Sequence, residues 1–199
     1  MLAGPRSRGG FTLIELMVTI TVFGLLEIAV APDLSYWIRS LKVRGAAEAM
    51  QNGLQKARLE AVRSNRVVTL WLVSTLDASC SLRSDVPNWV LSLVDPSGNC
   101  HVCASTTTSP FVIEKFTFGS AANQVSLGAV DAGGGAATSI SFDPLGQMSG
   151  NGLQCLRVSA ASGESRTLKI LVMPGGSIRM CDANLPSADA RSCPAVTIC

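Results

Sequence analysis

The chain has little of what catalytic and metal sites require. Its 199 residues include a single histidine, His101. That histidine lies between Cys100 and Cys103 in a stretch rich in turn-forming residues, and no set of nucleophile, acid and base can be assembled around it. A zinc site needs four ligands, commonly from a second C-x-x-C pair or two further histidines, and the sequence contains neither. We therefore expect no enzymatic activity, no cofactor and no metal ion.

The net charge is also small. The chain has 16 basic and 14 acidic residues, and its first ten residues contain Arg6 and Arg8 but no acid, so 14 of each sign remain beyond residue 10. A neutral chain has no overall positive field that attracts nucleic acid. Any binding of nucleic acid must therefore come from a local group of basic side chains.

One long apolar run is present, over residues 11–31. Its 21 residues would span about 30 Å as an α-helix, close to the hydrocarbon thickness of a bilayer. Arg6 and Arg8 precede the run, which places the leader in the cytoplasm and the C-terminus in the periplasm. An ordinary secretory signal has a shorter apolar core followed by an A-x-A-like cleavage site, whereas here the small residues Gly9 and Gly10 precede the run, so cleavage would leave the helix in place. We expect a single-pass segment of the bacterial inner membrane.

Two carboxylates interrupt this run. An unpaired Glu15 in lipid would cost about 2.5 to 3.5 kcal/mol on insertion scales. Cleavage after Gly10 would expose the α-amino group of Phe11, which could pair with Glu15 of the same subunit or of a neighbour. Glu27 lies 12 positions further, on nearly the opposite helix face. It either extends toward the membrane surface or contacts a specific partner, and we favour the first interpretation.

The residues around this junction resemble a known leader. Gly9-Gly10-Phe11-Thr12-Leu13-Ile14-Glu15-Leu16 is similar to the class III leader of type IV prepilins and type II secretion pseudopilins. In those proteins a prepilin peptidase cuts after the glycine and methylates the next residue, and the glutamate sets the register of subunits in a filament. The resemblance implies cleavage at Gly10, methylation of Phe11 and assembly through Glu15. It also implies other major and minor pilins, the prepilin peptidase and the inner membrane as partners. A plain anchor would explain neither the glycine pair nor the acid.

The rest of the chain reads as one α+β domain. About 168 residues follow the run, too few for two comfortable domains. Apolar residues spaced three and four apart predict an amphipathic helix over residues 32–66. The head, residues 67–199, then shows strand patterns. The eight predicted strands are 67–73, 89–94, 111–118, 124–130, 138–142, 153–159, 166–173 and 177–181. We expect a type IV pilin-like fold, with a long helix packed on antiparallel strands in two sheets.

Seven cysteines in an exported chain predict disulfides, with one cysteine left over. They are Cys80, Cys100, Cys103, Cys155, Cys181, Cys193 and Cys199. The sequence does not determine the pairing. A bond between Cys155 and Cys181 would link two strands, and Cys193 or Cys199 would hold the C-terminal tail. A redox role for Cys100-His101-Val102-Cys103 is disfavoured because such motifs usually begin a helix.

Three later segments, residues 54–64, 139–146 and 175–181, resemble GspH/FimT-type minor pilins and pseudopilins. FimT-type members bind DNA through a C-terminal Gly-Arg-x-Arg motif. Gly176 and Arg179 match its first and last positions, whereas Ser177 replaces the first arginine. The candidate phosphate contacts are Arg157, Arg166, Lys169, Arg179 and Arg191. The alternative for the arginines of the tail is solvation or pairing with Asp182 and Asp189.

Three functions remain open. We rank first a minor pilin in the priming complex and tip of a type IV pilus. The second is a FimT-type receptor that captures double-stranded DNA for natural transformation. The third is a GspH-like pseudopilin of type II secretion, against which the additional C-terminal cysteines count mildly.

Overall fold

A computed structural model describes residues 10–105 and 107–194, with only the backbone described at residues 28–33. The predicted leader, apart from Gly10, and Cys199 lie outside the described residues. The chain divides into two compact units, Met1–Trp37 and Ile38–Cys199. A single helix, α1 (Leu13–Ser64), contributes to both units. Each unit is described by itself below.

In the first unit, α1 begins immediately after Thr12. The Thr12 side-chain oxygen accepts a hydrogen bond from the backbone N–H of Glu15 at 3.3 Å, and the Thr12 carbonyl accepts one from Leu16 at 3.2 Å. A threonine at the N-cap followed three residues later by glutamate is the capping-box pattern. The start of the helix is therefore encoded locally.

The first unit leaves most of its apolar surface exposed. The large apolar side chains between Phe11 and Leu26 are all more than half exposed, from 51% at Val22 to 86% at Phe11. Judged over the residues described, no helix combines the length and the apolarity of a membrane span. The segment predicted at residues 11–31 is thus not found by this criterion, and the side chains of its last four residues are not described.

In the second unit, α1 presents a buried stripe to the head. Its members recur at helical spacing and are all 0% exposed: Val43, Ala46, Ala47, Met50, Leu54, Ala57 and Ala61. The four alanines allow close approach of the helix to the strands. Gly53 does the same, because a Cβ there would lie 2.7 Å from the Trp89 ring. The helix ends at Ser64, and the next residue, Asn65, has a φ of 51°, the left-handed conformation common after a helix.

Two antiparallel sheets complete the second unit. The five-stranded sheet has the order β3-β2-β1-β5-β6, and the four-stranded sheet has the order β4-β7-β8-β9. The first contains β1 (Val68–Leu72), β2 (Trp89–Ser92), β3 (Val112–Phe116), β5 (Ser139–Phe142) and β6 (Met148–Ser149). The second contains β4 (Val125–Val130), β7 (Cys155–Ala160), β8 (Leu168–Val172) and β9 (Ile178–Asp182). A short 3-10 helix, Gly119–Gln124, precedes β4.

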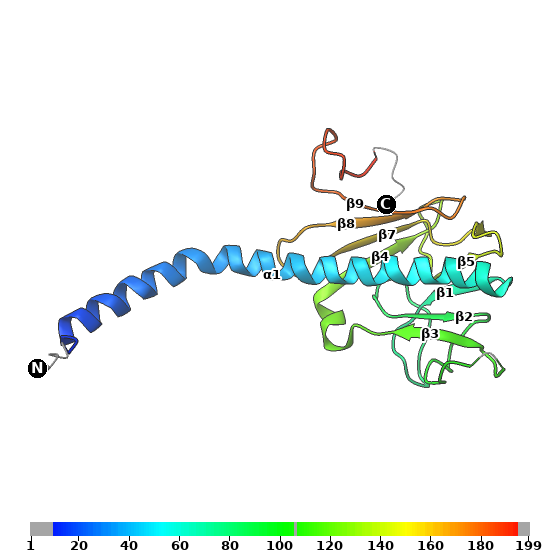
Figure 1. The fold of residues 1–199 in the computed structure, drawn as a ribbon, viewed down its shortest axis with the longest axis horizontal. Coiled ribbons are helices and arrows are strands. Elements are labelled where there is room, and N and C mark those ends of the chain that lie inside the picture. The colour runs from blue at the N-terminus through cyan, green and yellow to red at the C-terminus, as the bar shows by residue number, and fades with distance from the viewer. Residues whose placement is uncertain (1–9, 106, 195–199) are drawn as a thin grey trace, which may run out of the picture. The chain divides into compact units, whose positions relative to one another are not determined.

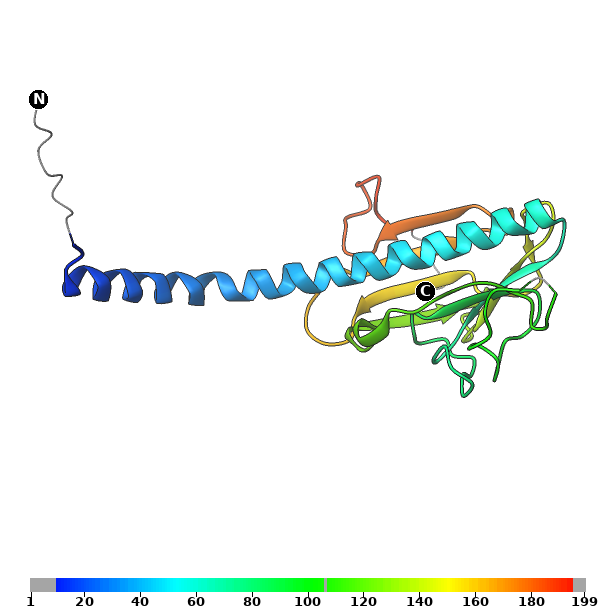
Figure 2. The same ribbon diagram turned by 60° about the horizontal axis from the view of Figure 1, so that its bottom comes forward.

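The helix stripe and both sheets form one core. Leu70 and Phe142 from the first sheet and Leu156 and Ile170 from the second join the α1 residues in a single buried cluster. Figures 1 and 2 show the cyan part of α1 lying along both sheets. The α+β fold with a helix on two antiparallel sheets is therefore confirmed.

All eight predicted strands are present in the described residues, and β6 was missed. With two residues, β6 is too short for a period-two pattern to be recognised. It forms because the turn after β5 brings Met148 opposite Phe142.

Candidate functional sites

The predicted cleavage and assembly residues lie on open surface. Gly10 and Phe11 are exposed, and a Cβ at Gly10 would meet nothing within 4 Å. The Glu15 side chain is exposed and makes no hydrogen bond or ion pair with any described residue. The role of Thr12 as N-cap was not predicted, although the Thr-x-x-Glu pattern carried the signal.

The structure brings two of the five candidate phosphate contacts together. Arg157 on β7 lies directly opposite Lys169 on β8, and on its other side it faces Gly128 of β4. Burial first and the nearby Arg157 charge second lower the pKa of Lys169. Like charges directly opposite each other destabilise a sheet. An anion bound across this pair would lessen the repulsion, which makes the pair a candidate anion contact.

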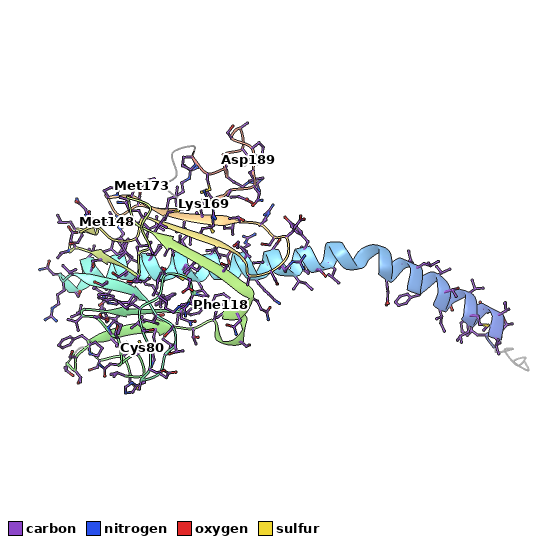
Figure 3. The ribbon with its side chains drawn as sticks, turned by 180° about the vertical axis from the view of Figure 1, so that it is seen from behind. Cys80, Phe118, Met148, Lys169, Met173 and Asp189 are labelled. Atoms are coloured by element: carbon purple, nitrogen blue, oxygen red, sulfur yellow. A yellow bond between two sulfur atoms is a disulfide. The ribbon has the colours of Figure 1, made fainter. Side chains whose placement is uncertain are left out.

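The other three candidates contact a carboxylate or the tail. The Arg191 guanidinium is paired with Asp189 at 2.9 Å, and Arg166 lies 3.5 Å from Asp182. Hydrogen bonds from Arg191 lower the pKa of Asp189 to about 2. Arg179 donates to the Ala190 carbonyl at 3.1 Å, which ties it to the tail. Figure 3 shows Lys169 on the sheet and Asp189 in the tail beyond it.

Gly176, the glycine of the incomplete Gly-Arg-x-Arg match, has a packing role. Its φ is +77°, and a Cβ there would lie 1.8 Å from the Gly146 carbonyl oxygen. The turn before β9 therefore touches the turn between β5 and β6, where Arg58 also donates to the Gly146 carbonyl at 3.0 Å. Close approach of two backbones explains this glycine without any nucleic acid.

The described disulfides are Cys80–Cys100 and Cys181–Cys193, and Cys103 is free and exposed. Cys155 is also disulfide-bonded. The predicted pairing of Cys155 with Cys181 is wrong, because the tail folds back beside β9 and places Cys193 with its Cα 4.9 Å from that of Cys181. A parallel bridge between Asp182 and Ser192 fixes this return.

The Cys100-His101-Val102-Cys103 segment is a loop. Lys115 donates hydrogen bonds to the carbonyls of Cys100, His101 and Val102, at 3.1 to 3.3 Å. Within residues 10–105 and 107–194, no group of three or more His, Cys, Asp or Glu side chains is arranged to hold a metal ion.

Comparisons with known proteins agree with this architecture. The model of the prokaryotic N-terminal methylation motif matches residues 5–30. A methylation motif joined by one helix to a β-rich head defines the class of pilin-like proteins, which are structural subunits rather than enzymes. Within that class, the chain belongs to the family of the type II transport protein GspH, whose model matches residues 46–192. The predicted resemblance to GspH/FimT-type proteins is confirmed.

Among solved structures, two crystal forms of the type IV minor pilin FimU from Pseudomonas aeruginosa are similar to this chain. One has 16% identity and a TM-score of 0.44, and covers 73% of this chain and 94% of its own. The other has 17% identity and a TM-score of 0.45, with coverage of 74% and 90%. A comparison with curated proteins gives no match.

Proposed function

We propose that the chain is a minor pilin of a type IV pilus that acts in the priming complex and stays near the pilus tip. The observation that carries this proposal is the first unit, in which the large apolar side chains described, from Phe11 to Leu26, are exposed on a helix that the methylation-motif model covers. A helix that is apolar on every side needs an apolar environment, either lipid or the packed helices of other subunits. The core of a filament supplies the packed helices of other subunits.

Before assembly, residues 11–31 hold the subunit in the inner membrane with the head in the periplasm. Removal of residues 1–10 then exposes the amino group of Phe11. Glu15 has no charged partner among the described residues, so an amine of its own or a neighbouring subunit supplies one. Pairing of these charges makes assembly favourable and sets the register of the subunit.

The first experiment examines the leader. Mass spectrometry of the native protein is expected to find an N-terminus at Phe11 carrying one methyl group. Gly10→Val is expected to leave the full-length precursor in membranes, whereas Gly24→Val, at another open glycine of the same apolar run, is expected to be processed normally. An intact starting methionine in the native protein would contradict the proposal.

Deletion of the gene distinguishes a role in a type IV pilus from a role in type II secretion. A minor pilin of the priming complex is expected to be needed for surface pili and dispensable for type II secretion. The family match to a type II transport protein makes the reverse result the specific alternative. Loss of secretion with normal pili would replace the pilus proposal by that of a pseudopilin.

A second candidate function, capture of double-stranded DNA, is supported by the like-charged pair Arg157 and Lys169. Phosphate contacts from two or three basic side chains give weak, salt-sensitive binding, which display at a filament tip would strengthen. In gel shifts of the full chain in non-ionic detergent, Arg157→Gln and Lys169→Gln are expected to weaken binding and lower the salt slope by about 1 each. Arg191→Gln is the control, because Arg191 is already paired with Asp189. No retardation at low salt would exclude this function.

A further inference from the structure

A cavity of about 350 Å³ lies where α1 ends beside the start of β3. One side of the cavity is formed by the last turn of α1 and by Arg66. The other side is formed by Leu93, which follows β2, and by Phe111 and Ile113 at the start of β3. All of its lining residues belong to the second unit. Neither the predicted assembly residues nor the candidate phosphate contacts reach it.

The side of the cavity beside β2 and β3, termed its floor, is apolar. Leu93, Phe111 and Ile113 line it, and each of these side chains is half-buried, so part of its apolar surface faces the cavity. A volume of this size is at the lower end of small-molecule sites and accommodates one large apolar side chain with a few polar atoms. The floor therefore selects an apolar group.

The side of the cavity formed by α1 and Arg66, termed its rim, carries one positive charge that no described residue compensates. Arg63 forms two hydrogen bonds of 2.8 Å with Glu60, so these two residues neutralise each other. Arg66 also lines the cavity, and its guanidinium has no hydrogen bond or ion pair with any described residue. A guanidinium presents paired N–H donors that match the geometry of a carboxylate. The rim therefore selects a single negative charge beside the apolar group.

The backbone of Phe111, one of the floor residues, is strained. Phe111 has a φ of 57°, a left-handed conformation that bulky side chains rarely adopt. Its N–H donates to the Thr108 carbonyl at 2.8 Å and closes a turn in this conformation. Strained residues persist where the surroundings force them, and they gather at ligand sites. Here the strain places an aromatic ring in the cavity wall.

We propose that this cavity binds an apolar carboxylate, in which a large apolar side chain sits on Leu93, Phe111 and Ile113 while the adjacent carboxylate pairs with Arg66. The same chemistry occurs in a free apolar acid and in the C-terminal residue of a polypeptide. This proposal does not rest on the pilin function proposed above, because none of the lining residues lies in the leader or in the first unit.

The test is a titration of the full chain in non-ionic detergent, followed by NMR at the Ile113 methyl groups. N-acetyl-L-phenylalanine is expected to bind at least tenfold more tightly than its uncharged amide, and N-acetylglycine is expected not to bind. Comparison with 3-phenylpropanoate separates the sources, since tighter binding of the acetylated amino acid indicates a polypeptide C-terminus and equal binding indicates a free acid. Equal affinity for N-acetyl-L-phenylalanine and its amide would overturn the proposal.

Matched variants complete the test. Arg66→Gln is expected to weaken binding of N-acetyl-L-phenylalanine about tenfold, whereas Arg44→Gln, at an exposed arginine of the same helix paired with Glu48, is expected to leave it unchanged. Phe111→Asn keeps a residue that tolerates the left-handed backbone but removes the ring, and is expected to abolish binding with the fold retained. Equal effects of the two arginine variants, or full binding by folded Phe111→Asn, would refute the site.

Discussion

The two parts of helix α1 differ in whether their apolar side chains are exposed or buried. Up to Trp37 the described large apolar residues are exposed, whereas from Val43 to Ala61 the apolar stripe is completely buried under two sheets. The second part uses small residues to approach the strands, and the first uses Leu, Ile, Val and Phe on every side. Folding of the head therefore buries the apolar stripe of the second part. The large apolar side chains of the first part stay exposed in the single chain.

The largest expected effect is the difference in filament incorporation between substitutions at Glu15 and Glu27, the two acids of the first part. Glu15→Val is expected to permit processing but to lower incorporation into filaments at least tenfold, because the subunit loses its charge partner for a neighbouring amine. Glu27→Val is the matched control and is expected to have little effect, since Glu27 is expected to extend toward the membrane surface. Filament recovery is measured by immunoblotting of sheared pili. Unchanged recovery for Glu15→Val would refute the pairing.

The next effect concerns the head alone. Gly176→Ala is expected to destabilise the second unit by about 3 kcal/mol, from the left-handed backbone and the contact with the Gly146 carbonyl. Gly175→Ala meets nothing within 4 Å and is expected to change little. Urea unfolding followed by tryptophan fluorescence measures both variants. Similar unfolding midpoints would show that the two turns do not pack as described.

A smaller effect tests how closely the second part of α1 approaches the sheet. Gly53→Ala is expected to destabilise the head by about 1 to 2 kcal/mol, because the new methyl group overlaps Trp89, which is 2% exposed and stacked on Phe116. Gly45→Ala, on the exposed face of α1, is expected to stabilise it by about 0.5 to 1 kcal/mol through helix propensity. In the same unfolding assay, the diagnostic result is a loss of stability for Gly53→Ala together with a gain for Gly45→Ala. Stabilisation by both would mean that Trp89 moves freely.

The smallest effect is local to the tail. The Asp189 carboxyl has its pKa lowered from 3.8 to about 2, so its contribution is complete above about pH 4 and is lost as the pH falls toward 2. The amide of Arg191, which donates to this carboxylate at 2.9 Å, is expected to shift in NMR spectra with a midpoint near pH 2. Asp189→Asn is expected to remove the transition. A midpoint near 3.8 would mean that the Asp189–Arg191 pair does not form in solution.

Much of the fold was predictable because its signals are local. The change from helical to alternating periodicity near residue 67 located the head, and every strand of four or more residues was recognised. The capping box at Thr12 was equally local and was overlooked.

Long-range geometry could not be predicted in the same way. The partner of Cys181 depends on how the tail returns beside β9, and the sequence does not encode that path in any periodic pattern. The pairing of Arg157 with Lys169 depends on the register of β7 and β8, which the intervening turn determines. The cavity near Arg66 arises only when α1, β2 and β3 meet.

The cross-link between Cys181 and Cys193 also has a consequence for how the tail can move. Leu171 is 6% exposed and packs in a small cluster with Cys155 and Cys181, against which Cys193 lies. With these two thiols reduced, the return of the tail beside β9 would rest on noncovalent contacts such as the bridge between Asp182 and Ser192. The disulfide restricts the 12-residue separation between the two cysteines in the unfolded chain, so reduction is expected to loosen the tail before the core of the head.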